Sequence, residues 1–412
     1  MAFIRPFKCI RPAEDVVSRI AALPYDVYNR AEAKNETIRE PLSFLTIDRA
    51  ETQLGDEVDT YDDIVYDKAK ELLDEMINNG NMFLDEDECY YIYELTMDGR
   101  AQSGLVACSS IDDYLDGTIK KHEKTREEKE QDRIKHVDTL NAQTGPIFLA
   151  YRGQKVIDET VAEIQKGQPI YDFLSTDDVR HKVWKVDNIE QINIISDAFE
   201  KMDNTYIADG HHRTASAVNV GLKRRRENPG YTGDEEFNFL LSVLFPHDQL
   251  MIMPYNRTVK DLNGLTENEF LDNVRENFDV EVIGKKPYQP TKKNEYGMYL
   301  DKDWYRLVPK KHLAIEKDPV SSLDVSILQD YLLQPILGIE DPRTDNRIDF
   351  IGGIRGLGEL ERRVETDMKV AFSMYSTSIE ELFDVADADK LMPPKSTWFE
   401  PKLRSGLFIH GI

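Results

Sequence analysis

The sequence of 412 residues contains only three cysteines, Cys9, Cys89 and Cys108. They are odd in number, widely spaced and form no Cys-x-x-Cys pair, which argues against a disulfide framework and a cysteine-based zinc site. No segment is apolar over the roughly 20 residues that cross a bilayer. The first eight residues also lack the long apolar run of a signal peptide. We therefore expect reduced thiols in a soluble, cytoplasmic protein without a membrane partner.

Positive charge is also in short supply. The chain has 52 Lys and Arg against 77 Asp and Glu, for a formal net charge of −25. An acidic surface argues against nucleic acid as a partner, and no helix-turn-helix pattern is present. Hydrophobic residues nevertheless make up 40 % of the chain, enough for a folded core. These features favour a globular protein with small-molecule partners, and they do not indicate an oligomeric state.

The order of helical and strand patterns predicts an α+β fold with mixed sheets and helices rather than a doubly wound sheet. The length predicts more than one domain, and the boundary is expected near residues 246–254. We thus predict a core over 1–250 and a C-terminal α+β region over 251–412 that folds back towards the site. Asp98-Gly99 predicts a hairpin turn between two strands. Strands are predicted at 90–95, 105–111, 147–151, 183–186, 237–245, 347–351 and 370–375, a hairpin around 299–304, and helices at 61–78, 120–140, 156–165, 188–202, 266–277, 323–337, 359–366 and 378–386.

The most informative segment is Tyr206–Ala215, in which a short apolar run meets Asp209-Gly210 and is followed by His211, His212 and Arg213. This order predicts a strand, a tight turn and the start of a helix, where unpaired amides and the helix dipole favour an anion. Gly210 lets the backbone approach a ligand closely, and Arg213 can hold phosphate oxygens in a bidentate manner. Asp209 is a candidate Mg²⁺ ligand or proton acceptor. The alternative is a helix capped by Asp209, with histidines that satisfy nearby carbonyls.

A basic segment precedes this box at residues 120–136. If it is helical throughout, one stripe combines His122, Arg126, Lys129, Arg133 and His136, which suits a phosphate or polyanion. The alternative is a solvated helix with ion pairs such as Glu130 with Arg133. The charge pattern alone favours the solvated helix.

Three further segments carry weaker signals. Lys395, Ser396 and Thr397 place a cation and two hydroxyls on a proline-framed loop, which suits either a phosphate or a docked terminal loop. The glycines of 352–358 lie between a predicted strand and a predicted helix, but their spacing matches neither the dinucleotide fingerprint nor the P-loop. Asp26, in Pro24-Tyr-Asp, is either a functional carboxylate or part of a turn.

Four boxes together resemble a bacterial and archaeal family long described as a domain of unknown function. They are Pro-Tyr-Asp-Val at 24–27, His-Glu-Lys-Thr at 122–125, Ala-Asp-Gly-His-His-Arg at 208–213 and Met-Pro-Pro-Lys-Ser-Thr at 392–397. The Asp-Gly-His-His-Arg box also resembles the Gly-x-x-Arg phosphate-binding box of the ParB/sulfiredoxin superfamily, which includes free serine kinases. That resemblance implies a ParB/sulfiredoxin-like nucleotide-binding core, with Gly210, His211, His212 and Arg213 on the phosphates. Glu123 and Asp26 are the candidates for the catalytic carboxylate of the kinases.

The resulting hypothesis is a kinase-like phosphotransferase that moves a phosphoryl group between ATP or ADP and a small hydroxylated metabolite, with L-serine and phosphoserine as the lead pair. Phosphoryl transfer depends mainly on positioning and charge neutralisation. One alternative is a metal-dependent phosphohydrolase with Asp209, His211 and His212 at the metal. Another is a non-enzymatic, nucleotide-responsive interaction module. The predicted catalytic residues are Asp26, Glu123, Asp209 and His212; the predicted substrate and phosphate ligands are Gly210, His211, Arg213, His122, Thr125, Arg133, Lys395, Ser396 and Thr397; and Asp209 is the predicted ligand of Mg²⁺.

Overall fold

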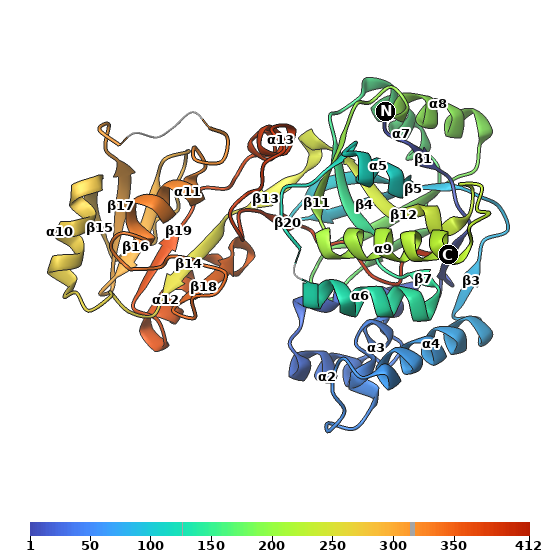
Figure 1. Cartoon of the computed structure of the whole chain (residues 1–412), viewed down its shortest axis with the longest axis horizontal. Coiled ribbons are helices and arrows are strands. Elements are labelled where there is room, and N and C mark those ends of the chain that lie inside the picture. The colour runs from blue at the N-terminus through green and yellow to red at the C-terminus, as the bar shows by residue number, and fades with distance from the viewer. Residues whose placement is uncertain (126, 314–317) are drawn as a thin grey trace. The chain divides into compact units, whose positions relative to one another are not determined.

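A computed structural model describes residues 1–125, 127–313 and 318–412 of the chain (Figure 1). Its contacts divide the chain into two compact units. The N-terminal unit comprises residues 1–250 and 401–412, and the C-terminal unit comprises residues 251–400. The last residues of the chain thus belong to the same unit as the first.

The N-terminal unit is built on a nine-stranded mixed sheet. β6 runs parallel to β11 and β8 runs parallel to β12, whereas the other neighbours are antiparallel. All residues of β12 are buried, which explains its continuous apolar sequence and confirms the predicted central strand. The sheet order is β6 (Ile119–Lys120), β11 (Thr205–Asp209), β8 (Ile147–Tyr151), β12 (Phe239–Pro246), β5 (Arg100–Ser110), β4 (Tyr90–Met97), β10 (Arg180–Val186) and β9 (Tyr171–Leu174), with β1 (Ile4–Arg5) paired to β5.

The predicted hairpin between β4 and β5 is confirmed. Asp98 and Gly99 form its turn with φ values of 52° and 78°, as a tight turn between two twisted strands requires. A second, four-stranded sheet has the order β3 (Met82–Leu84), β2 (Cys9–Pro12), β21 (Ile409–Gly411) and β7 (Ala142–Gln143). Because β21 pairs with both β2 and β7, it ties the C-terminus into the N-terminal unit.

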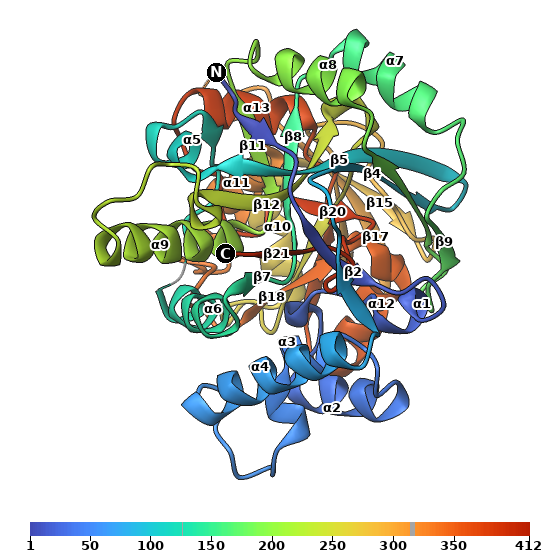
Figure 2. The same cartoon turned by 90° about the vertical axis from the view of Figure 1, so that its right-hand side faces the viewer.

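Helices flank these sheets. α9 packs against α6, and α6 packs against α4, which lies beside α3 (Figures 1 and 2). The predicted helix over 120–140 begins only at Glu127, because residues 119–120 pair with β11 as a strand. The helices of this unit are α1 (Val17–Ile20), α2 (Arg30–Arg39), α3 (Leu45–Asp48), α4 (Asp63–Asn78), α5 (Ile111–Asp116), α6 (Glu127–Leu140), α7 (Lys155–Ile164), α8 (Ile189–Phe199) and α9 (His211–Glu227).

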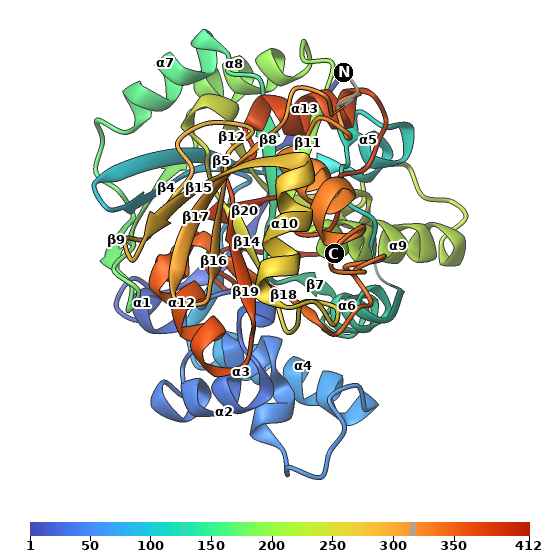
Figure 3. The same ribbon diagram turned by 90° about the vertical axis from the view of Figure 1, so that its left-hand side faces the viewer.

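The C-terminal unit contains a six-stranded antiparallel sheet with helices, seen in Figure 3. Capping boxes at Thr266 and Ser378 start α10 and α13, and the bounds of both helices agree with the predicted ranges. The predicted helix over 323–337 is shorter, because α11 ends at Leu328 and continues as a single π-helical turn. The strand order is β15 (Phe278–Gly284), β17 (Asp303–Pro309), β16 (Tyr296–Leu300), β19 (Val370–Ser373), β14 (Tyr255–Val259) and β18 (Ile348–Gly352); β13 (Met251–Met253) pairs with β20 (Trp398–Glu400), and the helices are α10 (Glu267–Asn277), α11 (Asp324–Leu328), α12 (Gly356–Thr366) and α13 (Ile379–Asp387).

The fold confirms the predicted α+β class with mixed sheets. Within the residues that the structure describes, no helix combines the length and the apolarity that a membrane span requires.

Candidate functional site

The predicted strand, turn and helix start around Asp209-Gly210 are present in the structure. β11 ends at Asp209, Gly210 takes a left-handed conformation with φ of 92°, and α9 begins at His211. Asp209 does not cap the helix; its Oδ1 accepts a hydrogen bond from the Gly210 amide at 2.7 Å. No side chain of the described residues caps the amino end of α9. The positive end of the helix dipole therefore has no carboxylate cap.

Asp209 forms an ion pair that the sequence did not predict. Its Oδ2 lies 2.8 Å from Nζ of Lys402, which follows the C-terminal unit in the sequence and belongs to the N-terminal unit. Burial by itself raises the pKa of Asp209, but the charges of Lys402 and Arg213 outweigh it and hold this pKa well below its usual range. Asp209 is therefore ionised at neutral pH, with both of its oxygens engaged.

The neighbouring histidines form a buried pair. The rings of His122 and His211 meet edge to face, with centroids 4.5 Å apart, and Oε2 of Glu123 lies 3.9 Å from Nδ1 of His211. Burial lowers the pKa of His122 to about 4, and burial together with His122 lowers the pKa of His211 well below 6.5. Both rings are thus neutral at pH 7. His212, one residue further along the helix, is only half-buried, because successive helical residues point about 100° apart.

Two buried nitrogens of this pair, Nδ1 of His122 and Nε2 of His211, have no hydrogen-bond partner among the described residues. His122 lies before α6 and not on its stripe, so the predicted basic stripe through His122 is wrong. Arg126, which was expected on the same stripe, lies outside the described residues. Thr125 donates from Oγ1 to Oε2 of Glu130 at 2.9 Å, an interaction at the start of α6.

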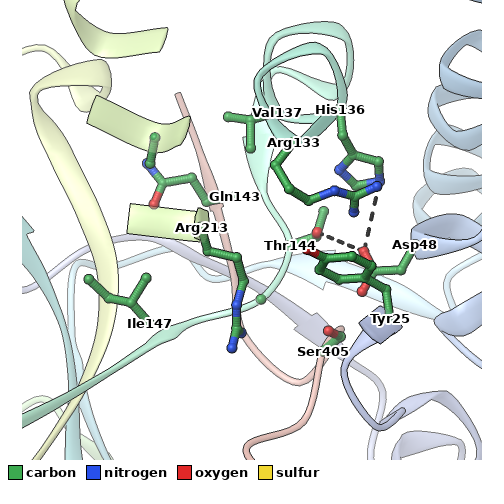
Figure 4. A pocket seen from close by; sticks show the side chains of 12 residues that line it. Tyr25, Asp48, Arg133, His136, Val137, Gln143, Thr144, Ile147, Arg213 and Ser405 are labelled. Atoms are coloured by element: carbon green, nitrogen blue, oxygen red, sulfur yellow. Dashed lines mark hydrogen bonds and ion pairs between the residues drawn. The ribbon is translucent and has the colours of Figure 1, made fainter. Parts of the chain in front are cut away.

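Arg213 points from the first turn of α9 into a small pocket, shown in Figure 4. Its Nη1 donates to the carbonyl of Pro146 at 2.7 Å, and a Cβ on Gly210 would lie 3.2 Å from its Nε and Nη2. Among the described residues, no carboxylate lies within ion-pair distance of this guanidinium, although Asp209 acts on it at longer range. Gly210 therefore allows the guanidinium to fold back over the turn.

Arg133 lines the same pocket from α6, the helix that packs against α9. It is buried, its guanidinium lies 4.1 Å from the ring centroid of Tyr25, and its Nε donates to Asp132 at 2.8 Å. The hydroxyls of Thr144 and Ser405 also line the pocket, which has a volume of about 30 Å³. Since one water needs about 10–15 Å³, this space fits a group of only a few atoms.

A larger pocket of about 210 Å³ shares four lining residues with the first: Tyr25, Asp48, Arg133 and His136. The exposed Asp26 lines it, as does Lys129. Of the predicted residues, the structure therefore brings Asp26, Arg133 and Arg213 to two adjoining pockets. The other residues of the two predicted boxes line neither pocket: His122, Glu123, Thr125, Asp209, Gly210, His211 and His212.

The Lys395–Thr397 loop belongs to the C-terminal unit. Lys395 is exposed, with φ of 58°, whereas Ser396 is buried and its hydroxyl donates to the carbonyl of Pro393 at 2.6 Å. The glycine-rich segment begins where β18 ends and leads through a short 3₁₀ turn, Gly353–Arg355, into α12, as the sequence predicted.

The described residues contain no group of three or more His, Cys, Asp or Glu side chains that is arranged to hold a metal ion. The only predicted magnesium ligand, Asp209, contacts Lys402 and the Gly210 amide through its two oxygens. Because both oxygens are engaged, Asp209 does not fit a Mg²⁺ ligand in this arrangement.

The polar residues of the site that were not predicted include Lys402, which neutralises Asp209, and Asp48, Thr144 and Ser405, which line the small pocket. Oγ1 of Thr144 donates to Oδ1 of Asp48 at 3.0 Å, and this carboxylate also lies 3.8 Å from Nε2 of His136. No local pattern marks these residues, because each reaches the site through contacts between distant parts of the chain.

A protein-family model described as "Protein of unknown function (DUF1015)" matches residues 4–326. The chain belongs to this family. The predicted membership in a family of unknown function is therefore confirmed. A search of curated proteins gives no match.

Several solved structures share a low similarity with the chain. A free serine kinase variant in complex with AMP is 13 % identical, with 73 % of this chain and 91 % of that chain covered and a TM-score of 0.36. SbnI from Staphylococcus aureus with a C-terminal truncation is 10 % identical, with 73 % and 85 % covered and a TM-score of 0.38. A conserved hypothetical protein from Pyrococcus furiosus is 13 % identical, with 73 % and 93 % covered and a TM-score of 0.34. Similarities at this level do not assign an activity.

Proposed function

We propose that the protein is a phosphotransferase that moves a phosphoryl group between ATP or ADP and a small hydroxylated metabolite, with L-serine and phosphoserine as the lead pair. One observation carries the proposal: Arg213 and Arg133, which are far apart in the sequence, line one small pocket beside the uncapped start of α9. Two guanidinium groups and a helix dipole suit the charge that a phosphoryl group carries during transfer.

In this proposal the small pocket holds the phosphoryl group. Arg213 binds its oxygens, and Arg133 adds a second positive charge that stacking on Tyr25 keeps in place. The hydroxyls of Thr144 and Ser405 are further donors at the same pocket. His211 is neutral, so it serves as a hydrogen-bonding group rather than as a cation. In the same proposal, His212 and Gly210 contact the phosphoryl group from the turn that carries Arg213, beside the pocket rather than in its lining.

The adjoining larger pocket suits the small substrate. Asp26 is the proposed acceptor of the hydroxyl proton, because its carboxylate lines this pocket together with Arg133. Glu123 is the second candidate for this base, and its carboxylate lies beside His211 rather than in the lining of the larger pocket. The resemblance of the Asp-Gly-His-His-Arg box to that of free serine kinases supports serine as the first substrate to test.

The first experiment measures phosphoryl transfer from ATP to L-serine and from phosphoserine to ADP, with and without magnesium. Arg213→Ala is expected to lower kcat/KM by about 10²–10³, the usual effect of removing one donor that stabilises transition-state charge. Arg226→Ala is the matched control, since it removes the same charge from an exposed position at the far end of α9. Equal effects of the two substitutions would contradict the proposal.

The same assays separate the alternatives. Release of phosphate from phosphoserine without nucleotide would favour a phosphohydrolase, and nucleotide binding without turnover would favour an interaction module. Asp26→Asn and Glu123→Gln then identify the base. Substitution of the residue that acts as the base is expected to lower kcat by about 10²–10⁴, with a smaller effect on KM.

A further inference from the structure

Arg257 on β14, in the C-terminal unit, carries a buried guanidinium. The residue is 3 % exposed. It donates to the carbonyls of Tyr255 and Lys395, the latter at 3.1 Å, and its guanidinium lies 5.4 Å from the ring centroid of Phe350. Among the residues that the structure describes, it has no carboxylate within ion-pair distance. Burial lowers the pKa of Arg257 to about 10, so it remains charged at neutral pH.

The two carbonyls and the ring of Phe350 stabilise this guanidinium, but a buried charge stays costly without an opposite charge, which favours an anion bound nearby. The hydrogen bond from Arg257 to the carbonyl of Lys395 connects it to the loop at 395–397. There the exposed ammonium of Lys395 lies 5.4 Å from the ring centroid of Tyr255 and has no ion pair with any described residue. Thr397, two residues further on, is half-buried and adds a hydroxyl. The loop therefore carries a second cation, on the residue whose carbonyl Arg257 contacts.

The glycine-rich segment at 352–358 adjoins this loop. Tyr255 pairs with Gly352 across β14 and β18, strands that lie side by side in Figure 3, and Trp398 packs against the same glycine. A Cβ at Gly352 would come within 2.9 Å of the indole ring, so glycine is required for this contact. Two segments that are separate in the sequence thus meet in one unit.

We propose that the C-terminal unit binds a phosphate-class anion at Lys395 and Thr397, with Arg257, which donates to the Lys395 carbonyl, as the buried positive charge. Arg257 positions the loop through the Lys395 carbonyl and adds its field, while the Lys395 ammonium contacts the anion directly. Two cations that pair with no carboxylate of the described residues match a dianion better than an anion of single charge. The proposal goes beyond the transferase activity and does not depend on the Arg213 pocket.

The test is a calorimetric titration of the full chain with inorganic pyrophosphate, in the Arg213→Ala background that removes the other proposed anion site. Binding is expected to remain in this background. Adding Lys395→Ala is expected to weaken it at least about tenfold, whereas Lys286→Ala, which removes an exposed charge of the same unit, leaves it unchanged. Loss of all binding in Arg213→Ala alone, or equal effects of the two lysine substitutions, would overturn the proposal. The phosphotransfer assay is a separate measurement, so loss of transferase activity and loss of pyrophosphate binding are distinguished.

The role of Arg257 is tested with two substitutions of different charge. Arg257→Met is expected to weaken pyrophosphate binding about tenfold or more, and Arg257→Lys is expected to recover part of it. Pyrophosphate should also raise the melting temperature of the wild type more than that of Arg257→Met, because an anion that binds only the folded state stabilises it. Unchanged binding in a folded Arg257→Met protein would refute the role. If this variant does not fold, the Arg257→Lys and Lys395→Ala titrations decide.

Discussion

Gly210 offers the sharpest test of the phosphate site, because the structure provides a matched control for it. Gly210 has φ of 92°, and a Cβ there would lie 3.2 Å from two nitrogens of Arg213. Gly117 has a similar left-handed conformation, with φ of 86°, but a Cβ there would meet nothing within 4 Å. Alanine at either position therefore carries the same backbone strain, and only alanine at 210 displaces the guanidinium.

The magnitudes follow from these contacts. Each alanine is expected to lower the free energy of unfolding by about 1–2 kcal/mol, the cost of a left-handed conformation for a residue with a Cβ. A contact at 3.2 Å is tight, so Arg213 must shift by a few tenths of an ångström. Since a displacement of about 1 Å can cost 10²-fold in rate, we expect Gly210→Ala to lower kcat/KM about tenfold.

Urea denaturation measures the first effect, and the phosphotransfer assay measures the second. Gly117→Ala should match Gly210→Ala in stability and the wild type in activity. If Gly210→Ala retains the activity of Gly117→Ala, then the position of Arg213 over the turn has no bearing on catalysis. The proposed phosphate site would then have to be abandoned.

Three further substitutions test the electrostatics of both units. Lys402→Met removes the cation beside Asp209 and is expected to lower the free energy of unfolding at pH 7 by about 1–3 kcal/mol, between the values of surface and buried pairs. Because the pKa of Asp209 is depressed, this contribution is present above about pH 4 and is lost only in stronger acid. An unchanged urea denaturation curve at pH 7 would contradict the ion pair. Burial lowers the pKa of His122 to about 4, so the unfolded chain binds a proton more readily than the folded one, and the free energy of unfolding falls by up to about 3 kcal/mol as the pH drops from 6.5 to 4. His122→Gln should make this decline shallower. An unchanged pH profile of stability would show that the ring is not buried as described. Burial raises the pKa of Asp324 to about 7, so stability declines as the pH rises from 4 to 7. Asp324→Asn, whose side-chain oxygen can still accept from the Asn294 amide, should therefore have a higher melting temperature than the wild type at pH 8. A lower melting temperature would refute the raised pKa.

The predicted secondary structure agrees with the observed elements wherever local signals are strong. The apolar run of β12, the Asp98-Gly99 turn and the capping box at Thr266 each specify their element through nearby residues. The helix over 120–140 was predicted too long because β6 is only two residues of strand, and its pairing with β11 comes from a distant segment. Local propensity cannot register such a pairing.

The Tyr206–Ala215 segment alone determined that a strand, a left-handed glycine and a helix start carry Asp209 and Arg213, because these features depend on residues within a few positions of each other. Only the tertiary structure decided which groups meet there. Lys402 neutralises Asp209 from the far end of the chain, and Arg133 reaches the pocket of Arg213 because α6 packs on α9. Charge neutralisation and pocket shape depend on distances through space. These distances are set only when the sheet pairs strands that are far apart in the sequence.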